Sequence, residues 1–325
     1  MIFFSKSVRG WLAEKNRAQI VMAAPMTRGH SNESAFKHGR AVYILGATMA
    51  PLVPAFARKY HLPFSHVNTK AYHVMIKSFP TELGAMRAAA RLYPNRIDFM
   101  VDTYDLKQGV RNAITVAKEL RAKGQSVVGV TIDSGKTIGD YIRTIRWTRR
   151  MLDRAGFPKM SIAVAGNFDE YKIAELVKTN APVNRAFIGT EAVTSSDAPK
   201  LETVLKLAEM RCGKTVSYQA KLAPGKESYP GRKQVWRTYR RGQMVRDVIA
   251  LDHERARGRP LLRRMVNNGK VTYRLPSLQE IQRYVQKELA TLPERLKDIH
   301  RQHPYSVKIS PELQRRFNVI KKEHS

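Results

Sequence analysis

Polar or glycine-rich residues follow four apolar segments of the sequence, where strands would end. They are Asp102-Thr103-Tyr104, Asp133-Ser134-Gly135-Lys136, Gly166-Asn167 and Gly189-Thr190. Carboxylates can hold ribose hydroxyls or Mg²⁺, and backbone N–H groups beside glycines can bind phosphate. Loops that follow parallel strands meet at one face, so we predict that these residues form one site. The local alternative is that the aspartates cap the next helices and the glycines make turns.

The apolar segments themselves predict buried parallel strands. They span residues 97–102, 126–132, 160–165 and 184–189, and they show little alternation between apolar and polar residues. Helical periodicity fills the gaps between them, most clearly over 106–123. Successive parallel strands with helical crossovers form either a doubly wound sheet or a barrel, and periodicity does not choose between the two.

The C-terminal part of the sequence has a different pattern. Polar and apolar residues alternate over 214–240 around Pro224-Gly225 and Pro230-Gly231, which predicts a β-hairpin. Ser277 with Glu280 three residues later predicts the start of a helix over 277–299. We therefore predict an α/β core over residues 1–210 and, over 211–325, a hairpin and helical extension packed on that core.

Composition narrows the class of protein. With 43% apolar and 26% charged residues the 325-residue chain is typical of globular proteins. No apolar run is long enough to span a bilayer and the apolar start at Met1 is too short for a secretory signal, so we expect a cytoplasmic protein. The single cysteine, Cys212, excludes an internal disulfide framework and a thiolate metal cluster, and we predict no metal held by the protein alone.

The net charge of +31 is unusual. It favours binding of polyanions, which include phosphate esters, nucleic acid and anionic membrane surfaces, but it also fits a solvated basic surface. Two groups of residues would suit nucleic acid, one on a helix and one near an aromatic side chain. They are Arg143, Arg146 and Arg150, and Arg237, Arg240 and Arg241 beside Trp236.

Several ordered motifs resemble a known family. Val101–Asp105 followed by Gly109–Ile114 resembles the VDTYD and GVxNAI segments of nicotinate phosphoribosyltransferases. Further matches in order are Ser78–Leu83 (upstream), Ile132–Gly135, Gly166–Tyr171, Gly189–Thr190, Val193–Pro199 and Tyr229–Val235. The likeness runs with gaps from about Arg17 to Pro311, which is nearly the whole chain.

The resemblance implies an irregular TIM-like (β/α) barrel and a type II phosphoribosyltransferase of NAD salvage. Such an enzyme joins nicotinate to phosphoribosyl pyrophosphate, giving nicotinate mononucleotide and pyrophosphate, with ATP hydrolysis through a phosphohistidine. The reaction needs a positioned base and a neutralised leaving pyrophosphate, for which Mg²⁺ and a basic cleft are suited. The implied ligands are therefore phosphoribosyl pyrophosphate with Mg²⁺, nicotinate and ATP.

The resemblance also assigns roles to residues. Counted back from the Ser-Phe-Pro motif, the phosphorylated histidine is His73, although a lone histidine is more often a hydrogen-bonded structural one. Asp102 would hold ribose hydroxyls, and Asp133 with Ser134 would face the base and ribose. Phosphate would be bound at Gly166, Asn167, Gly189 and Thr190, while Thr103, Tyr104 and Gly135 belong to the same substrate-binding loops.

Two positions and one missing domain depart from the family pattern. Thr131 stands where the family has an arginine near the pyridine carboxylate, which predicts weak nicotinate binding unless Lys136 supplies the cation. Glu191 places an anion beside the phosphate loop. The family's N-terminal domain has no counterpart in this sequence, so we expect a homo-oligomer or a partner that supplies that domain. The competing hypothesis is a catalytically inactive phosphoribosyltransferase scaffold that binds nucleic acid or another polyanion through its basic surface.

Overall fold

The structure, a computed structural model, describes residues 19–22, 28–46, 48–49, 58–61, 69–197, 199–200, 203–301 and 303–324. The apolar start at Met1 and the first residue of the family likeness, Arg17, lie outside the described residues. The chain divides into two compact units, Met1–Pro199 and Lys200–Ser325. The division falls between residues 199 and 200, whereas the sequence pattern suggested 210 and 211.

The first unit is built on a seven-stranded parallel sheet with the strand order β2-β1-β7-β6-β5-β4-β3. The strands are β1 (Gln19–Met22), β2 (Thr48–Met49), β3 (Thr69–Ala71), β4 (Ile97–Met100), β5 (Gly129–Ile132), β6 (Ser161–Val164) and β7 (Arg185–Ile188). Strands β4 to β7 lie within the four predicted segments. Every residue of β4, β5 and β7 is buried, which explains why these segments lack alternation.

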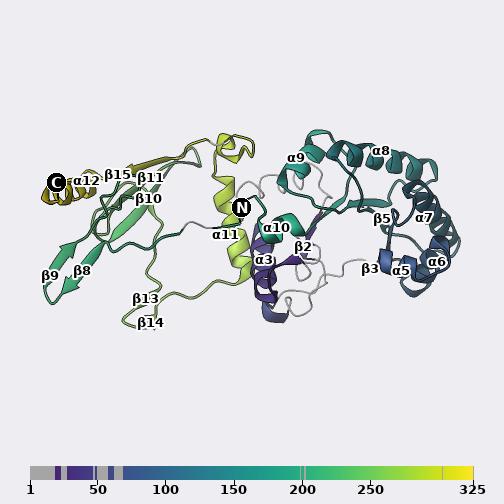
Figure 1. Cartoon of the computed structure of the whole chain (residues 1–325), viewed down its shortest axis with the longest axis horizontal. Coiled ribbons are helices and arrows are strands. Elements are labelled where there is room, and N and C mark those ends of the chain that lie inside the picture. The colour runs from purple at the N-terminus through teal and green to yellow at the C-terminus, as the bar shows by residue number, and fades with distance from the viewer. Residues whose placement is uncertain are drawn as a thin grey trace. The chain divides into compact units, whose positions relative to one another are not determined.

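Helices connect the strands, as the crossovers of a parallel sheet require. They are α3 (Asn32–Leu45), α5 (His73–Lys77), α6 (Glu82–Leu92), α7 (Leu106–Arg121), α8 (Ile138–Arg154), α9 (Glu170–Lys178) and α10 (Thr190–Thr194). Figure 1 shows α5 to α9 following one another in an arc around the strands. Helix α7 buries Val110, Ala113 and Ala117 on one face, as its periodicity predicted.

The predicted α/β class is confirmed, but a closed TIM-like barrel is not present in the described residues. From β3 to β7 the strand order follows the sequence, as it does in a barrel, and β1 then pairs with β7. The sheet ends at β2 and β3, and no ladder joins these two edges among the described positions. Strand β2 contributes two residues and β3 three, which leaves little backbone for a closing ladder.

The second unit contains a four-stranded sheet with the order β12-β10-β11-β15 and two separate hairpins. The sheet comprises β10 (Lys233–Arg240), β11 (Gln243–Leu251), β12 (Arg259–Pro260) and β15 (Ser306–Ile309). The hairpins are β8 (Glu209–Cys212) with β9 (Thr215–Tyr218) and β13 (Val266–Asn267) with β14 (Lys270–Val271). The helices are α11 (Leu278–Ala290), the 3-10 turn η1 (Glu294–Lys297) and α12 (Pro311–Glu323).

The predicted location of the hairpin turns was wrong. The reversal between β10 and β11 falls at Arg241-Gly242, where both residues have positive φ (50° and 77°), as a two-residue hairpin turn requires. Pro224-Gly225 makes a turn within a loop, closed by the bond from the Lys226 amide to the Ala223 carbonyl. Proline and glycine mark turns but do not show which strands the turns join.

Helix α11 begins where the sequence predicted and ends earlier. Ser277 and Glu280 form a reciprocal capping box at its start. The helix ends at Ala290 rather than at residue 299, because Pro293 follows and cannot continue the hydrogen-bond ladder.

Candidate active site

Asp102 is the most strongly positioned carboxylate at the strand ends. Strands β4 and β5 are parallel neighbours, so the residues that follow them lie side by side. Oδ2 of Asp102 accepts hydrogen bonds from the Asp133 amide and the Ser134 hydroxyl, both at 2.7 Å. Its Oδ1 is buried without a hydrogen-bond partner among the described residues. An unpaired buried oxygen is costly, so this atom is suited to accept a hydrogen bond from a ligand.

His73 lies against both aspartates. It is the first residue of α5, directly after β3, and its Nδ1 is 2.8 Å from the Thr103 hydroxyl. Its Nε2 is 3.8 Å from Asp102 Oδ1 and 3.9 Å from Asp133 Oδ2. The His73 side chain is 32% exposed, so the ring is open to a ligand on one side. The structure thus brings together His73, Asp102 and Asp133, to which the family resemblance assigned roles in the reaction.

The environment of Asp133 favours its protonated form. Burial raises the pKa of this carboxyl, and the negative charge of Asp102 raises it further, while His73 and Lys70 act in the opposite direction. Two carboxylates that share a small volume resist simultaneous ionisation without a cation or donor between them. The pair of carboxyl groups is therefore suited to bind ribose hydroxyls or a hydrated cation.

The helix-capping alternative for these aspartates is wrong. Helix α7 is capped by Asp105, whose carboxylate accepts from the Gln108 amide at 2.7 Å. Helix α8 is capped by Thr137 in a capping box with Asp140. Asp102 and Asp133 are therefore not required for capping α7 and α8.

A basic cavity of about 240 Å³ lies beside Asp133, at the start of α8. Its lining residues are Asp133, Gly135, Lys136, Thr137, Ile138, Tyr141, Gly166, Asn167 and Lys172. The two lysines and the N-terminus of a 17-residue helix provide a positive field that suits a phosphate group.

Position 166 at this cavity requires a glycine, because of its backbone conformation and its close neighbours. Its φ is +93°, and a Cβ there would lie 2.5 Å from the Tyr141 hydroxyl and 2.8 Å from the Asp133 carbonyl oxygen. Asn167 follows in the left-handed region, with a φ of +48°. Consecutive residues of this kind turn the chain so that its N–H groups can bind an anion.

The remaining predicted substrate residues have fewer contacts with the strand-end cluster, which consists of His73, Asp102 and Asp133. Gly189 and Thr190 follow β7, at the same edge of the sheet, and start α10. The Glu191 carboxylate accepts a hydrogen bond from Ser196, so it is engaged within its own loop. Tyr104 is 65% exposed.

Thr131 lies in the interior of the sheet and is fully buried. Its hydroxyl donates to Asp98 Oδ1 at 2.9 Å and accepts from Lys70 Nζ at 2.5 Å. Asp98 is also ion-paired with Arg185, which in turn donates to the Ser161 hydroxyl at 2.7 Å.

The cation beside Thr131 is therefore Lys70 of β3, whereas Lys136 lines the cavity at the start of α8. Sequence reasoning missed Lys70. The sequence offered no clear signal, because Lys70 stands in a strand of three residues, too short for a hydrophobic pattern.

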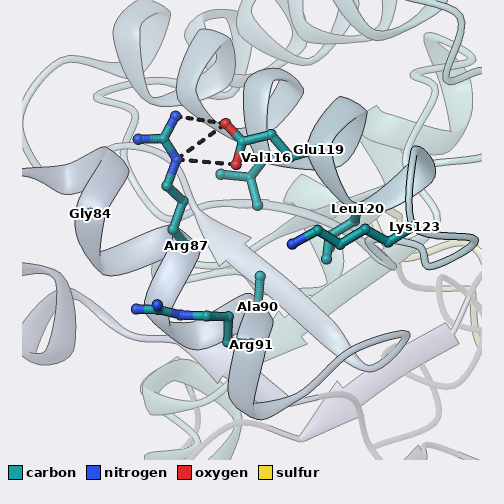
Figure 2. A pocket seen from close by; sticks show the side chains of 8 residues that line it. All are labelled: Gly84, Arg87, Ala90, Arg91, Val116, Glu119, Leu120 and Lys123. Atoms are coloured by element: carbon teal, nitrogen blue, oxygen red, sulfur yellow. Dashed lines mark hydrogen bonds and ion pairs between the residues drawn. The ribbon is translucent and has the colours of Figure 1, made fainter.

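A second cavity, of about 300 Å³, lies between α6 and α7 (Figure 2). Arg87 donates to both carboxylate oxygens of Glu119 across it, and both side chains are more than a third exposed. Arg91 and Lys123 add two further cations (Figure 2). None of the predicted site residues lines this groove, and none of its residues is joined to the Asp102 cluster by a described contact.

The two arginine groups that suggested nucleic-acid binding are partly occupied by contacts within the protein. Arg237 forms a two-pronged ion pair with Asp247, at 2.8 and 2.9 Å, and hydrogen bonding to that carboxylate raises its pKa. Arg143 pairs with Asp140, and Arg146 donates to the Thr179 carbonyl. The ion pairs of Arg143 and Arg237 reduce the charge that the two groups present to a polyanion.

The described residues contain no cluster of three or more His, Cys, Asp or Glu side chains arranged to hold a metal ion. In the part of the chain that the structure covers, no helix is both long and apolar enough to cross a membrane.

Comparisons with known proteins agree with the chemistry that this site suggests. A family model described as the nicotinate phosphoribosyltransferase C-terminal domain matches residues 255–316. The nicotinate phosphoribosyltransferase pncB2 of Mycobacterium tuberculosis is 32% identical over 299 residues, which cover 92% of this chain and 61% of that protein. The nicotinate phosphoribosyltransferase of Bacillus subtilis is 29% identical over 320 residues, which cover 90% of this chain and 63% of that protein. The chain thus spans about three fifths of the length of these relatives.

Solved structures show the same fold. The crystal structure of human nicotinic acid phosphoribosyltransferase matches with a TM-score of 0.69 at 20% identity, covering 97% of this chain and 73% of that chain. The nicotinate-nucleotide pyrophosphorylase of Pyrococcus furiosus matches with a TM-score of 0.67 at 21% identity, covering 89% of this chain and 69% of that chain. These two likenesses show an α/β fold shared with phosphoribosyltransferase structures. The sequence relatives and the family model show that the chain belongs to the nicotinate phosphoribosyltransferase family.

Proposed function

We propose that this protein transfers a phosphoribosyl group from phosphoribosyl pyrophosphate to nicotinate, forming nicotinate mononucleotide and pyrophosphate in NAD salvage. The observation that supports it most is the cluster of His73, Asp102 and Asp133 next to a glycine-bounded basic cavity. A carboxylate pair and an anion site side by side match a substrate that carries ribose hydroxyls and phosphates on one scaffold.

In this proposal each group has one task. The unpartnered Oδ1 of Asp102 accepts a hydrogen bond from a ribose hydroxyl, and Ser134 fixes the carboxylate from its other side. As the bond at C1 loosens, positive charge develops on the ribose and is stabilised by the nearby carboxylates. The cavity of Lys136 and Lys172, with the backbone at Gly166 and Asn167, balances the phosphate charge.

Mg²⁺ and ATP are the ligands we propose in addition. Asp133 offers carboxylate oxygens, the ligand type that Mg²⁺ prefers, and would hold the cation together with the oxygens of phosphoribosyl pyrophosphate. Mg²⁺ would supply neutralisation of the leaving pyrophosphate. For ATP we propose His73 as the phosphoryl acceptor, because the Thr103 hydroxyl holds Nδ1, Nε2 is left for a phosphoryl group, and the side chain is partly exposed.

Three further proposals rest on the family. The sheet order supports a barrel in the complete fold, with β2 and β3 as its closing strands. We also propose that the active form is a homo-oligomer, or is completed by a separate domain, and that it works in the cytoplasm where NAD salvage substrates occur. Sedimentation with and without phosphoribosyl pyrophosphate measures the oligomeric state.

The test of the proposed reaction is product formation by the 325-residue protein from phosphoribosyl pyrophosphate and Mg²⁺, with and without ATP. Nicotinate, nicotinamide and quinolinate are supplied in parallel, and nucleotides are separated by chromatography. We expect nicotinate mononucleotide, formed faster with ATP. Formation of no mononucleotide from any of the three bases contradicts the proposal.

A further inference from the structure

The Lys70 side chain lies on the face of the sheet that carries the Thr131 and Asp98 side chains, below the strand-end cluster. Strand β3 places its Nζ 2.5 Å from the Thr131 hydroxyl and 3.6 Å from the centre of the Phe187 ring. Thr131 is in β5 and Asp133 follows its last residue, Ile132, so the two residues lie about 7 Å apart along the extended chain. The ammonium therefore lies one layer beneath the carboxylates of the proposed site.

The hydrogen bonds around Lys70 leave two of its three donors unused among the described residues. Asp98, the nearest buried carboxylate, is ion-paired with Arg185 and accepts the Thr131 hydroxyl proton. The Thr131 oxygen is the hydrogen-bond acceptor that the described residues offer to Lys70 Nζ. An ammonium has three donors, so two of them have no protein acceptor among the described residues.

The surroundings hold the ammonium in place without neutralising it. The Phe187 ring presents its face to the ammonium and is itself packed against Ala163 and Ala165. Lys70 remains partly accessible, although its neighbour Ala71 is fully buried. A cation with free donors, an aromatic neighbour and small apolar residues beside it has the chemistry of a subsite for an anionic group on an apolar ligand.

We propose that Lys70 is the specificity-determining residue that binds the carboxylate of the aromatic acid and so selects nicotinate over its uncharged amide. This inference rests on the proposed function and names the residue that distinguishes nicotinate from nicotinamide. The carboxylate would accept the free donors of Lys70, and the ring would extend toward Asp133. The amide offers no negative charge to the ammonium, so it gains less from the same contact.

The proposal predicts a pH dependence with a defined sign. Burial lowers the pKa of Lys70 to about 8. The charge of Arg185 lowers it too, while Asp98, Asp133 and Asp102 raise it. Above that pH the ammonium loses its proton and its attraction for a carboxylate, so nicotinate should bind more weakly while nicotinamide binding stays unchanged.

Calorimetric titration of the 325-residue protein tests the inference. Phosphoribosyl pyrophosphate with Mg²⁺, nicotinate and nicotinamide are titrated separately into wild type, Lys70→Met, Lys70→Arg and Lys136→Met. Loss of a charge-assisted bond predicts that Lys70→Met weakens nicotinate binding by roughly 10- to 150-fold and leaves phosphoribosyl pyrophosphate binding intact. Lys70→Arg should recover part of the loss, and Lys136→Met should weaken phosphoribosyl pyrophosphate rather than nicotinate.

The outcomes separate the inference from the function on which it rests. Nicotinate binding that is equal in wild type and Lys70→Met, with nicotinamide still excluded, overturns the role of Lys70 and leaves phosphoribosyl transfer standing. Wild type that binds neither phosphoribosyl pyrophosphate nor nicotinate overturns the proposed function as well. The pH series on wild type needs no variant to fold, and nicotinate affinity that does not fall between pH 7 and 9 contradicts the inference independently.

Discussion

The buried ammonium of Lys70 should cost folding free energy, and its removal should stabilise the protein at neutral pH. Burial, the first cause of the shift, lowers the pKa of Lys70 from 10.5 to about 8. One pKa unit corresponds to about 1.4 kcal/mol, so keeping the lysine charged in the folded state costs about 3 kcal/mol at pH 7. Lys70→Met keeps most of the side-chain volume and removes this cost.

The sign of the effect follows from the lowered pKa. Below pH 8 the lysine is charged in both the folded and the unfolded protein, and the full cost is present. Between pH 8 and 10.5 the folded protein releases the proton first, so the cost declines and disappears above 10.5. The stability gain of Lys70→Met should therefore shrink as the pH rises.

Urea unfolding followed by circular dichroism measures this directly at pH 7 and pH 10. We expect Lys70→Met to be more stable than wild type by about 1–3 kcal/mol at pH 7, because the lost bond to Thr131 offsets part of the gain. At pH 10 the difference should be much smaller. Lys123→Met, a change of an exposed lysine, serves as the control. A Lys70→Met variant that is less stable than wild type at both pH values would refute the reasoning, since the ammonium would then be compensated within the fold.

Three other predictions concern the same unit. Asp98→Asn leaves Arg185 without its buried anion and should lower the free energy of unfolding by about 3–5 kcal/mol in urea. A loss below about 1 kcal/mol would contradict the ion pair. Gly109→Ala places a Cβ 2.0 Å from the Val101 carbonyl oxygen and should lower both the melting temperature and the affinity for phosphoribosyl pyrophosphate. The control Gly139→Ala, whose Cβ would have no contact below 3.5 Å, should not lower stability. Equal melting temperatures of the two variants would contradict the close approach at Gly109. His73→Ala should abolish acid-labile labelling by γ-labelled ATP, and labelling that persists would exclude His73 as the acceptor.

Hydrophobic periodicity was sufficient for the elements that position the site. Strands β4 to β7 and helix α7 are buried on the faces that their apolar residues predict, because these elements obtain their stability from burial. The meeting of Asp102 with Asp133 then follows from parallel pairing of β4 and β5.

Features that depend on long-range geometry were not predictable in the same way. Lys70, Asp98 and Arg185 come from three strands far apart in the sequence, and each alone looks like an ordinary charged residue. They come into contact only when β3, β4 and β7 present the same face to the interior. The hydrophobic pattern of the sequence does not fix the register of these strands. The same limit applies to Arg237, whose partner Asp247 lies on the neighbouring strand of the second unit.

Pyrophosphate release from phosphoribosyl pyrophosphate is the measurement that tests the central claim most directly. Initial rates are compared for wild type, Asp102→Asn and the distant Arg91→Ala, at saturating nicotinate, Mg²⁺ and ATP. We predict nicotinate-dependent release by wild type and Arg91→Ala, and a loss of at least about 100-fold in Asp102→Asn, because an asparagine cannot supply the negative charge that stabilises the developing cation. Equal rates in wild type and Asp102→Asn, or no nicotinate-dependent release by wild type, would contradict the assignment of the strand-end cluster as a phosphoribosyltransferase site.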